Sequence, residues 1–267
     1  MANILLHLLP ATLYLALAWA CHGAHAQATN RKLMLALLPA AIVAHALALS
    51  ETLFANAGLN LGFASSLSLT LWLAMLVYGL ESLLTPLPQL LRIAAPVAAA
   101  ASLLPLLLSG HPQTIALHGW AHKAHIVVAL LAYGLYTLAI FHALLLVATE
   151  RRLHRPPAPG QQAGLPLLTQ ERLLFRLVQT AFVFLSLTIL SGALFSNEIF
   201  GKPFVLTHKA VFGFAAWALF AILLIGRHLR GWRGNTAIRW MLAGFFFLVL
   251  AYTGSRFVLE FVLGRSL

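Results

Sequence analysis

The long apolar runs are the feature of this sequence that most restricts its fold. A helix needs about 20 consecutive apolar residues to cross the hydrocarbon core of a bilayer. The chain contains eight such runs, at roughly 3–20, 33–50, 63–82, 90–109, 124–147, 174–195, 208–226 and 238–261. In lipid every backbone polar group must find its partner within the protein, which favours helices. The sequence therefore predicts an all-α, polytopic membrane helix bundle with about eight transmembrane helices, and a single domain over residues 1–267.

The composition excludes a soluble domain. Only 9% of the residues are charged, whereas a soluble domain has about 25%. The formal net charge of +11 comes from basic residues that flank the spans, and no basic stripe with exposed aromatic residues suggests nucleic-acid binding. Membrane lipid is therefore the expected surrounding, with no nucleic-acid partner. The single cysteine, Cys21, rules out a disulfide within the chain.

The distribution of the basic residues predicts the orientation of the bundle. Twelve of the 17 Lys and Arg residues lie in the loops that follow the first, third, fifth and seventh spans. The other five lie on the opposite side: Lys123, Lys202, Lys209, Arg256 and Arg265. Cytoplasmic loops carry an excess of Lys and Arg. We therefore expect a multi-pass protein of the bacterial inner (plasma) membrane, with both termini outside.

Histidines at the outer face are the candidate ligands of a cofactor. His125 opens the fifth span and His208 opens the seventh, so both are expected at the same depth. Imidazole is the commonest metal ligand in proteins and often holds haem iron axially. Haem fits better than zinc, which usually takes three or four protein ligands. We expect a non-covalent, b-type haem whose iron is bound by His125 and His208, with His45 in the second span as the reserve ligand.

Cations and further histidines near this face complete the predicted site. The residues expected to contact the haem propionates are Lys123, Lys202, Lys209 and Arg256. His118 and His122 are expected near the propionates or at the membrane interface. Each outer histidine could instead be an interface residue with its tip in water. His45 could instead form a hydrogen bond to a neighbouring helix.

Two histidines lie at the other end of the same spans. His142 is 17 residues after His125, and His228 is 20 residues after His208, which is about 25 to 30 Å of helix rise. Neither can share a haem with its outer neighbour. His142 is interpreted as a helix-packing residue, and His228 as either a solvated loop residue or a ligand of a second, inner site. The small residues in "LAYG" and "LSGALF" are interpreted as sites of close helix packing.

Several segments resemble one known family. "HIVVALLAYG", with His125 at its start and Tyr133 eight residues on, "SGALFSNEIFG", "LLIGRHLRGWRG" with His228, and "GWRGNTAIRWMLAGFFFLVLAYTGSRFVLE" are similar to segments of the cytochrome c assembly protein family (CcsA, CcmC and relatives). The resemblance is closest over 118–262 and to the YpjD/HemX-like branch. It implies an eight-span bundle that binds or handles haem and has haem-delivery or cytochrome c maturation proteins as partners. It does not imply the thioether-forming activity.

The chain also departs from the family pattern. The tryptophan-rich motif W-G-x-x-W-x-W-D is replaced by Phe200 and "PFVL" with no aspartate, and the second outer histidine has no match. These departures leave a second hypothesis, a non-haem accessory or regulatory membrane protein on the same fold. A small-solute or metal transporter is a third, but the inverted repeats expected of many transporters are not visible. No nucleophile–base pair or phosphate loop predicts an enzyme.

Overall fold

Helices make up almost all of the structure. The computed structural model describes residues 2–21, 29–54, 59–108, 114–115, 119–153, 165–196 and 207–262. The helices are α1 (Ala2–Ala20), α2 (Thr29–Leu53), α3 (Phe63–Leu84), α4 (Pro88–Leu107), α5 (Gly119–Leu153), α6 (Leu167–Leu194), α8 (His208–Arg230) and α9 (Gly234–Val249). After α9 the helix continues through a π-helical turn, η1 (Leu250–Gly254), a short α10 (Ser255–Phe257) and a second π-helical turn, η2 (Val258–Val262). Two short strands, β1 (Leu59–Asn60) and β2 (Thr114–Ile115), pair antiparallel.

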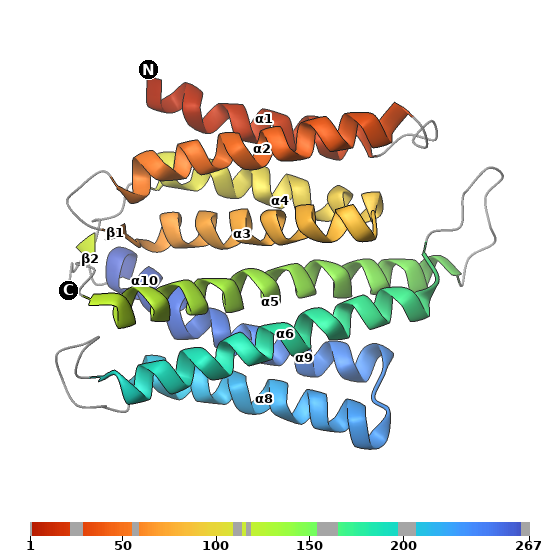
Figure 1. Cartoon of the computed structure of the whole chain (residues 1–267), viewed down its shortest axis with the longest axis vertical. Helices are drawn as coiled ribbons and strands as arrows, with labels where there is room; N and C mark the ends of the chain where they lie inside the picture. The colour runs from red at the N-terminus through yellow and green to blue at the C-terminus, as the bar shows by residue number, and fades with distance from the viewer. Residues whose placement is uncertain are drawn as a thin grey trace.

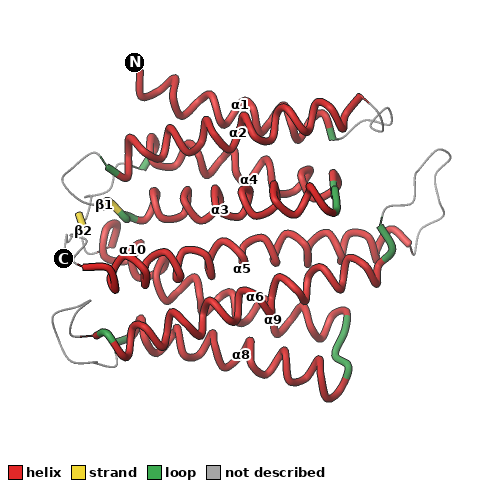
Figure 2. The backbone as a smooth tube through the Cα atoms, in the orientation of Figure 1, coloured by secondary structure: helices red, strands yellow, loops and turns green. Residues whose placement is uncertain are grey.

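The arrangement confirms the predicted polytopic helix bundle. The helices lie side by side and alternate in direction, and the first and last described helices have their free ends at the same end of the bundle (Figures 1 and 2). Seven helices are long and apolar enough to cross a membrane, and the apolar part of α1, Ile4–Ala20, is slightly shorter. We name the end where α1, α3, α5 and α8 begin the outer end, after the predicted orientation, and the opposite end the inner end.

The bundle has two parts that meet at α5. The N-terminal sub-bundle, α1 to α4, has a buried core that includes Tyr14, Met75 and Leu91. The C-terminal sub-bundle, α5, α6, α8 and α9, has a second core in which Tyr136 of α5 stacks on Phe220 of α8 with ring centroids 3.8 Å apart. One face of α5 contributes to the first core and the other face to the second. The position of α5 therefore relates the two sub-bundles to each other.

A glycine allows α5 to approach α3 closely. A Cβ atom placed on Gly134 would come within 2.7 Å of the Leu73 Cβ atom and 3.5 Å of the Ala74 backbone nitrogen. Both of these atoms are fixed to the backbone of α3, so a side chain at 134 would require the helices to separate. This contact confirms the interpretation of "LAYG" as a site of close helix packing.

At the outer end, polar side chains of the last helical segment form hydrogen bonds with the backbone at the start of α3. Both carboxylate oxygens of Glu260 accept from the Phe63 backbone N–H, at 2.9 and 3.1 Å, and so cap the first turn of α3. The Tyr252 hydroxyl donates to the Leu61 carbonyl at 3.0 Å. A carboxylate at a helix N-terminus is stabilised by the unpaired backbone N–H groups and the helix dipole. These contacts join the end of the chain to the start of α3.

Arg227 holds the α8–α9 turn at the inner end. Gly231 ends α8 in the left-handed conformation, with φ 65°. Arg227 donates to the Glu171 carboxylate of α6 at 2.7 Å and to the Trp232 carbonyl at 3.1 Å. Its guanidinium also lies 4.5 Å from the centroid of the Phe175 ring. The turn and α6 are therefore linked through this partly buried side chain.

Candidate functional site

The strongest candidate ligand, His125, lies on the second turn of α5 and faces α6. Because α5 begins at Gly119 rather than near 124, His122 and His125 both belong to the helix. The His125 side chain is half-buried, and its Nδ1 atom lies 2.8 Å from the hydroxyl oxygen of Ser191 on α6. A Cβ atom on Gly192 would come within 3.2 Å of the His125 Cε1 atom. The small residues of "LSGALF" therefore leave room for the imidazole ring between the two helices.

The hydrogen bonds of Ser191 favour the tautomer of His125 that carries its proton on Nδ1. The Ser191 hydroxyl donates to the Thr188 carbonyl at 3.1 Å, so its oxygen is left to accept. Both contacts of Ser191 are satisfied together when Nδ1 of His125 is the donor in the 2.8 Å contact. In neutral imidazole the other nitrogen, Nε2, consequently holds a lone pair. Metal-ligating histidines usually have this arrangement, in which one ring nitrogen is bonded to a protein group and the other faces the metal.

An apolar groove runs beside His125 between α5 and α6. Its volume is about 230 Å³, and its lining residues are Trp120, Ala121, Ala124, His125, Val128, Leu187, Leu190, Ser191, Leu194 and Phe195. The Trp120 and Phe195 rings pack edge to face across it, with centroids 5.9 Å apart. Leu187, Leu190 and Leu194 are exposed and lie on the outside of the bundle. The groove therefore offers an imidazole, two aromatic rings and an apolar wall that faces the surrounding lipid.

The outer half of the C-terminal sub-bundle is less tightly packed than the inner half. In α8 no residue from His208 to Ala215 is buried, whereas Ala216, Phe220, Leu223 and Gly226 are. In α6 no residue between Leu185 and Ser196 is buried. Apolar side chains in this half are consequently left partly exposed.

The predicted cations differ in their burial. Arg256 is 6% exposed, and its guanidinium lies 5.4 Å from the centroid of the Tyr252 ring. Lys209 is half-buried and lies near enough to Arg256 for their charges to interact. Lys123 is exposed on α5, and Lys202 lies outside the described residues. An ionisable residue within a span is by default a candidate functional residue. The buried Arg256 is therefore the strongest functional candidate among the four predicted cations.

A chain of aromatic contacts connects Arg256 to α5. The Tyr252 ring lies 6.5 Å from the Tyr133 ring, measured between centroids. The Tyr133 hydroxyl donates to the Leu248 carbonyl at 2.7 Å. Tyr133 lies eight residues after His125 on the same helix, which is about 12 Å of rise.

The remaining predicted ligands occupy different surroundings. His208 is exposed at the first residue of α8, and His228 is exposed near the inner end of the same helix. His45 is fully buried, with its Nε2 atom 2.9 Å from the Ser68 hydroxyl and its Nδ1 atom 3.4 Å from the Tyr14 hydroxyl. Both ring nitrogens of His45 are thus occupied by neighbouring helices, which is the packing role considered for it above. His118 lies outside the described residues.

One buried polar pair was not predicted. His142, interpreted above as a packing residue, is 2% exposed, and its Nε2 atom lies 3.0 Å from the Glu81 carboxylate of α3. Ser191 and Glu81 were both missed, since neither stands in a motif. The only signal in the sequence was a polar residue within an apolar run.

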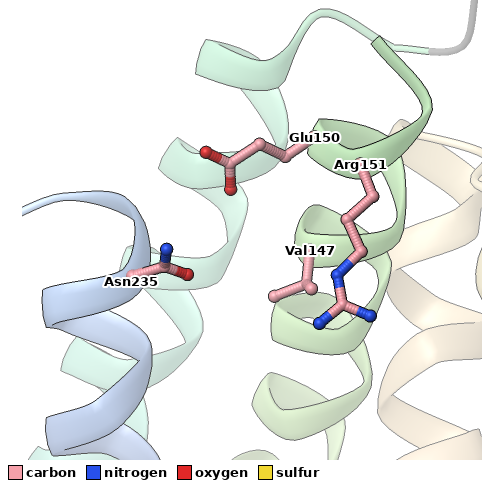
Figure 3. A pocket seen from close by; sticks show the side chains of 4 residues that line it. All are labelled: Val147, Glu150, Arg151 and Asn235. Atoms are coloured by element: carbon pink, nitrogen blue, oxygen red, sulfur yellow. The ribbon is translucent and has the colours of Figure 1, made fainter. Parts of the chain in front are cut away.

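A second, larger cavity lies at the inner end. Its volume is about 340 Å³, and Val147, Glu150 and Arg151 of α5 and Asn235 of α9 line it. Figure 3 shows Glu150 reaching from α5 toward Asn235. No group of three His, Cys, Asp or Glu side chains that could hold a metal ion occurs among the described residues. The cavity lies at the opposite end of the bundle from His125, so its residues add no ligand to the candidate site.

Comparisons with known proteins agree on one family. The family model described as "Cytochrome C assembly protein" matches residues 33–263. Inner membrane protein YpjD of Escherichia coli K12 is 32% identical over 138 residues, which is 52% of this chain and 52% of that protein. A cytochrome c biogenesis protein CcsA of Prochlorococcus marinus is 31% identical over 88 residues, which is 33% of this chain and 28% of that protein.

One further relative is matched over more of its length. A 28.8 kDa protein of Azospirillum brasilense is 28% identical over 214 residues, which is 76% of this chain and 77% of that protein. In the YpjD and CcsA relatives, by contrast, the chain spans about half of the length or less. No solved structure matches the chain.

Proposed function

Because the chain belongs to the cytochrome c assembly protein family, we propose that it binds haem non-covalently at the outer end of its bundle and serves in cytochrome c assembly. The E. coli relative is named an inner membrane protein, and we place this chain in the inner membrane with both termini outside. His125 is the residue that would bind the haem iron. The proposed partners of the chain are proteins of haem delivery or cytochrome c maturation.

The observation that carries the proposal is the hydrogen bond between His125 and Ser191. It leaves the lone pair on Nε2 of His125, the form of imidazole that binds iron. The groove supplies what the rest of a haem requires on that side, an apolar wall with two aromatic rings. At about 230 Å³ it is smaller than typical enclosed ligand pockets of about 300–1,000 Å³. This size agrees with a flat ligand held against a wall and not enclosed.

The other residues receive roles by their position. Lys209 and Arg256 lie near enough to each other at the outer end for their charges to interact, and they are the candidates for contact with the haem propionates. His208 is the candidate for a second ligand that would bind the iron, because it opens α8 at the outer end. His45 and His228 are not assigned to this haem. Haem itself would supply the iron, and the protein would supply its ligand, its wall and the orientation of the imidazole.

The test is the absorption spectrum of the purified protein and of single variants. We expect a Soret band in the wild type and its loss in His125→Ala. Ser191→Ala should weaken haem binding by about 10- to 100-fold, as removal of a hydrogen-bond partner of a ligating histidine does. His208→Ala should change a low-spin spectrum to a high-spin one.

His228→Ala is the matched control, because it removes a histidine of α8 that lies about 30 Å from His208 along the helix. It should leave the spectrum unchanged. A folded His125→Ala protein with full haem content and an unchanged spectrum would refute the ligand assignment. A wild-type protein without haem after growth with added haem would favour the accessory hypothesis, which the altered tryptophan-rich segment supports.

A further inference from the structure

Glu81 and His142 join the two sub-bundles through a hydrogen bond between two candidate membrane-spanning helices, α3 and α5. Glu81 lies three residues before the end of α3, and His142 lies in the inner half of α5, 11 residues before its end. The His142 Nε2 and Glu81 Oε2 atoms are 3.0 Å apart, and the side chains are 1% and 13% exposed. Ionisable side chains inside a span are rare and usually functional. The pair has no part in the proposed haem site, since His142 lies about 25 Å below His125 by helix rise.

The two atoms of the pair outside the hydrogen bond, His142 Nδ1 and Glu81 Oε1, bear on whether the pair is ionised or neutral. His142 Nδ1 and Glu81 Oε1 are buried and have no hydrogen-bond partner within the described part of the chain. A buried ion pair offsets the loss of hydration only when further hydrogen bonds satisfy its remaining atoms. This pair lacks those bonds. A neutral carboxylic acid beside a neutral imidazole avoids the cost of two buried charges, with the same number of protons.

The neighbouring ionisable groups do not favour a charged pair. Tyr78 lies one turn before Glu81 and donates its hydroxyl proton to the Leu87 carbonyl. Beyond it, the Cys21 carbonyl accepts from Arg92 of α4, so this cation is directed toward the end of α1. On α6, Glu171 is paired with Arg227.

We propose that Glu81 and His142 form a proton-binding site inside the membrane, in which the carboxyl group of Glu81 holds the proton and donates it to Nε2 of His142. Release of that proton toward the inner end, where Glu81 is slightly exposed, would leave a carboxylate. The net charge at the joint of α3 and α5 changes from zero to minus one in this step. The contact between the sub-bundles is therefore coupled to one proton.

Infrared spectroscopy of the purified full-length protein at neutral pH tests the proposal. The difference spectrum between wild type and Glu81→Gln should contain the carbonyl stretch of a protonated carboxylic acid. The matched control is Glu150→Gln, which removes a glutamate from the inner end of α5 and should show only the loss of carboxylate bands. Loss of carboxylate bands alone in Glu81→Gln would overturn the proposal.

A second measurement needs no variant and covers the case in which Glu81→Gln fails to fold. A hydrophobic carbodiimide reacts with protonated carboxyl groups in apolar surroundings and not with carboxylates. Peptide mass spectrometry of the labelled wild type should find the adduct at Glu81 in preference to the other glutamates. Labelling that spares Glu81 while the infrared spectrum shows only carboxylates would identify the pair as an ionised structural contact. Neither result depends on haem, so this proposal can fail while the haem proposal holds.

Discussion

Substitution of Gly134 by alanine should weaken the contact between the two sub-bundles. The new methyl group would come within 2.7 Å of the Leu73 Cβ atom. Because that atom is attached directly to the backbone, no side-chain rotation can relieve the overlap. The helices α3 and α5 would have to move apart along a contact that also carries the Glu81–His142 hydrogen bond.

The expected cost can be isolated with a second glycine. Overpacking of a tightly packed contact costs about 1–3 kcal/mol. Replacement of a helical glycine by alanine also gains up to about 1 kcal/mol of helix propensity. A Cβ atom added to Gly213 of α8 would meet no atom within 4 Å, so Gly213→Ala should show only the gain. The difference between the two variants is therefore the overlap alone, about 1–3 kcal/mol.

The assay is reversible unfolding in mixed micelles, followed by circular dichroism or tryptophan fluorescence. Since about 1.4 kcal/mol corresponds to a factor of ten, the folding equilibrium constants of Gly134→Ala and Gly213→Ala should differ by roughly 5- to 150-fold. Equal stability of the two variants would show that α3 and α5 are not packed at this distance, and would refute the reasoning.

Three further predictions concern the two ends of the bundle. Burial raises the pKa of the Cys21 thiol, and the thiolate is the reactive form. Alkylation of the folded protein should therefore be slower than that of the unfolded chain and should accelerate only as the pH rises above the usual thiol range. Arg227→Ala leaves the nearly buried Glu171 without its 2.7 Å partner and should cost about 1–3 kcal/mol in unfolding measurements. Substitution of the exposed Arg230 by alanine should change the free energy of unfolding by less than about 0.5 kcal/mol. Equal effects of the two substitutions would contradict the assignment of Arg227 as the partner of Glu171. A reporter that is active only in the cytoplasm should be inactive when fused after Leu267, and full activity would reverse the predicted orientation.

The number and position of the helices could be predicted from the sequence because a membrane span is a local property. Its length is set by the bilayer, and its backbone hydrogen bonds are made within the segment itself. The run at 124–147 thus predicted α5, and small residues such as Gly134 predicted close packing. The boundaries were less accurate, since α5 begins at Gly119 and brings His122 into the helix.

The partners of the buried polar groups depended on the tertiary structure. Ser191 meets His125 across 66 residues of chain, and His142 meets Glu81 across 61. Such contacts follow from the rotation and depth of whole helices, which many weak packing interactions decide together and which no short motif encodes. For the same reason the sequence left both His45 and His125 as candidate ligands. In the structure neighbouring helices occupy both ring nitrogens of His45, while a serine of α6 orients His125 beside an apolar groove.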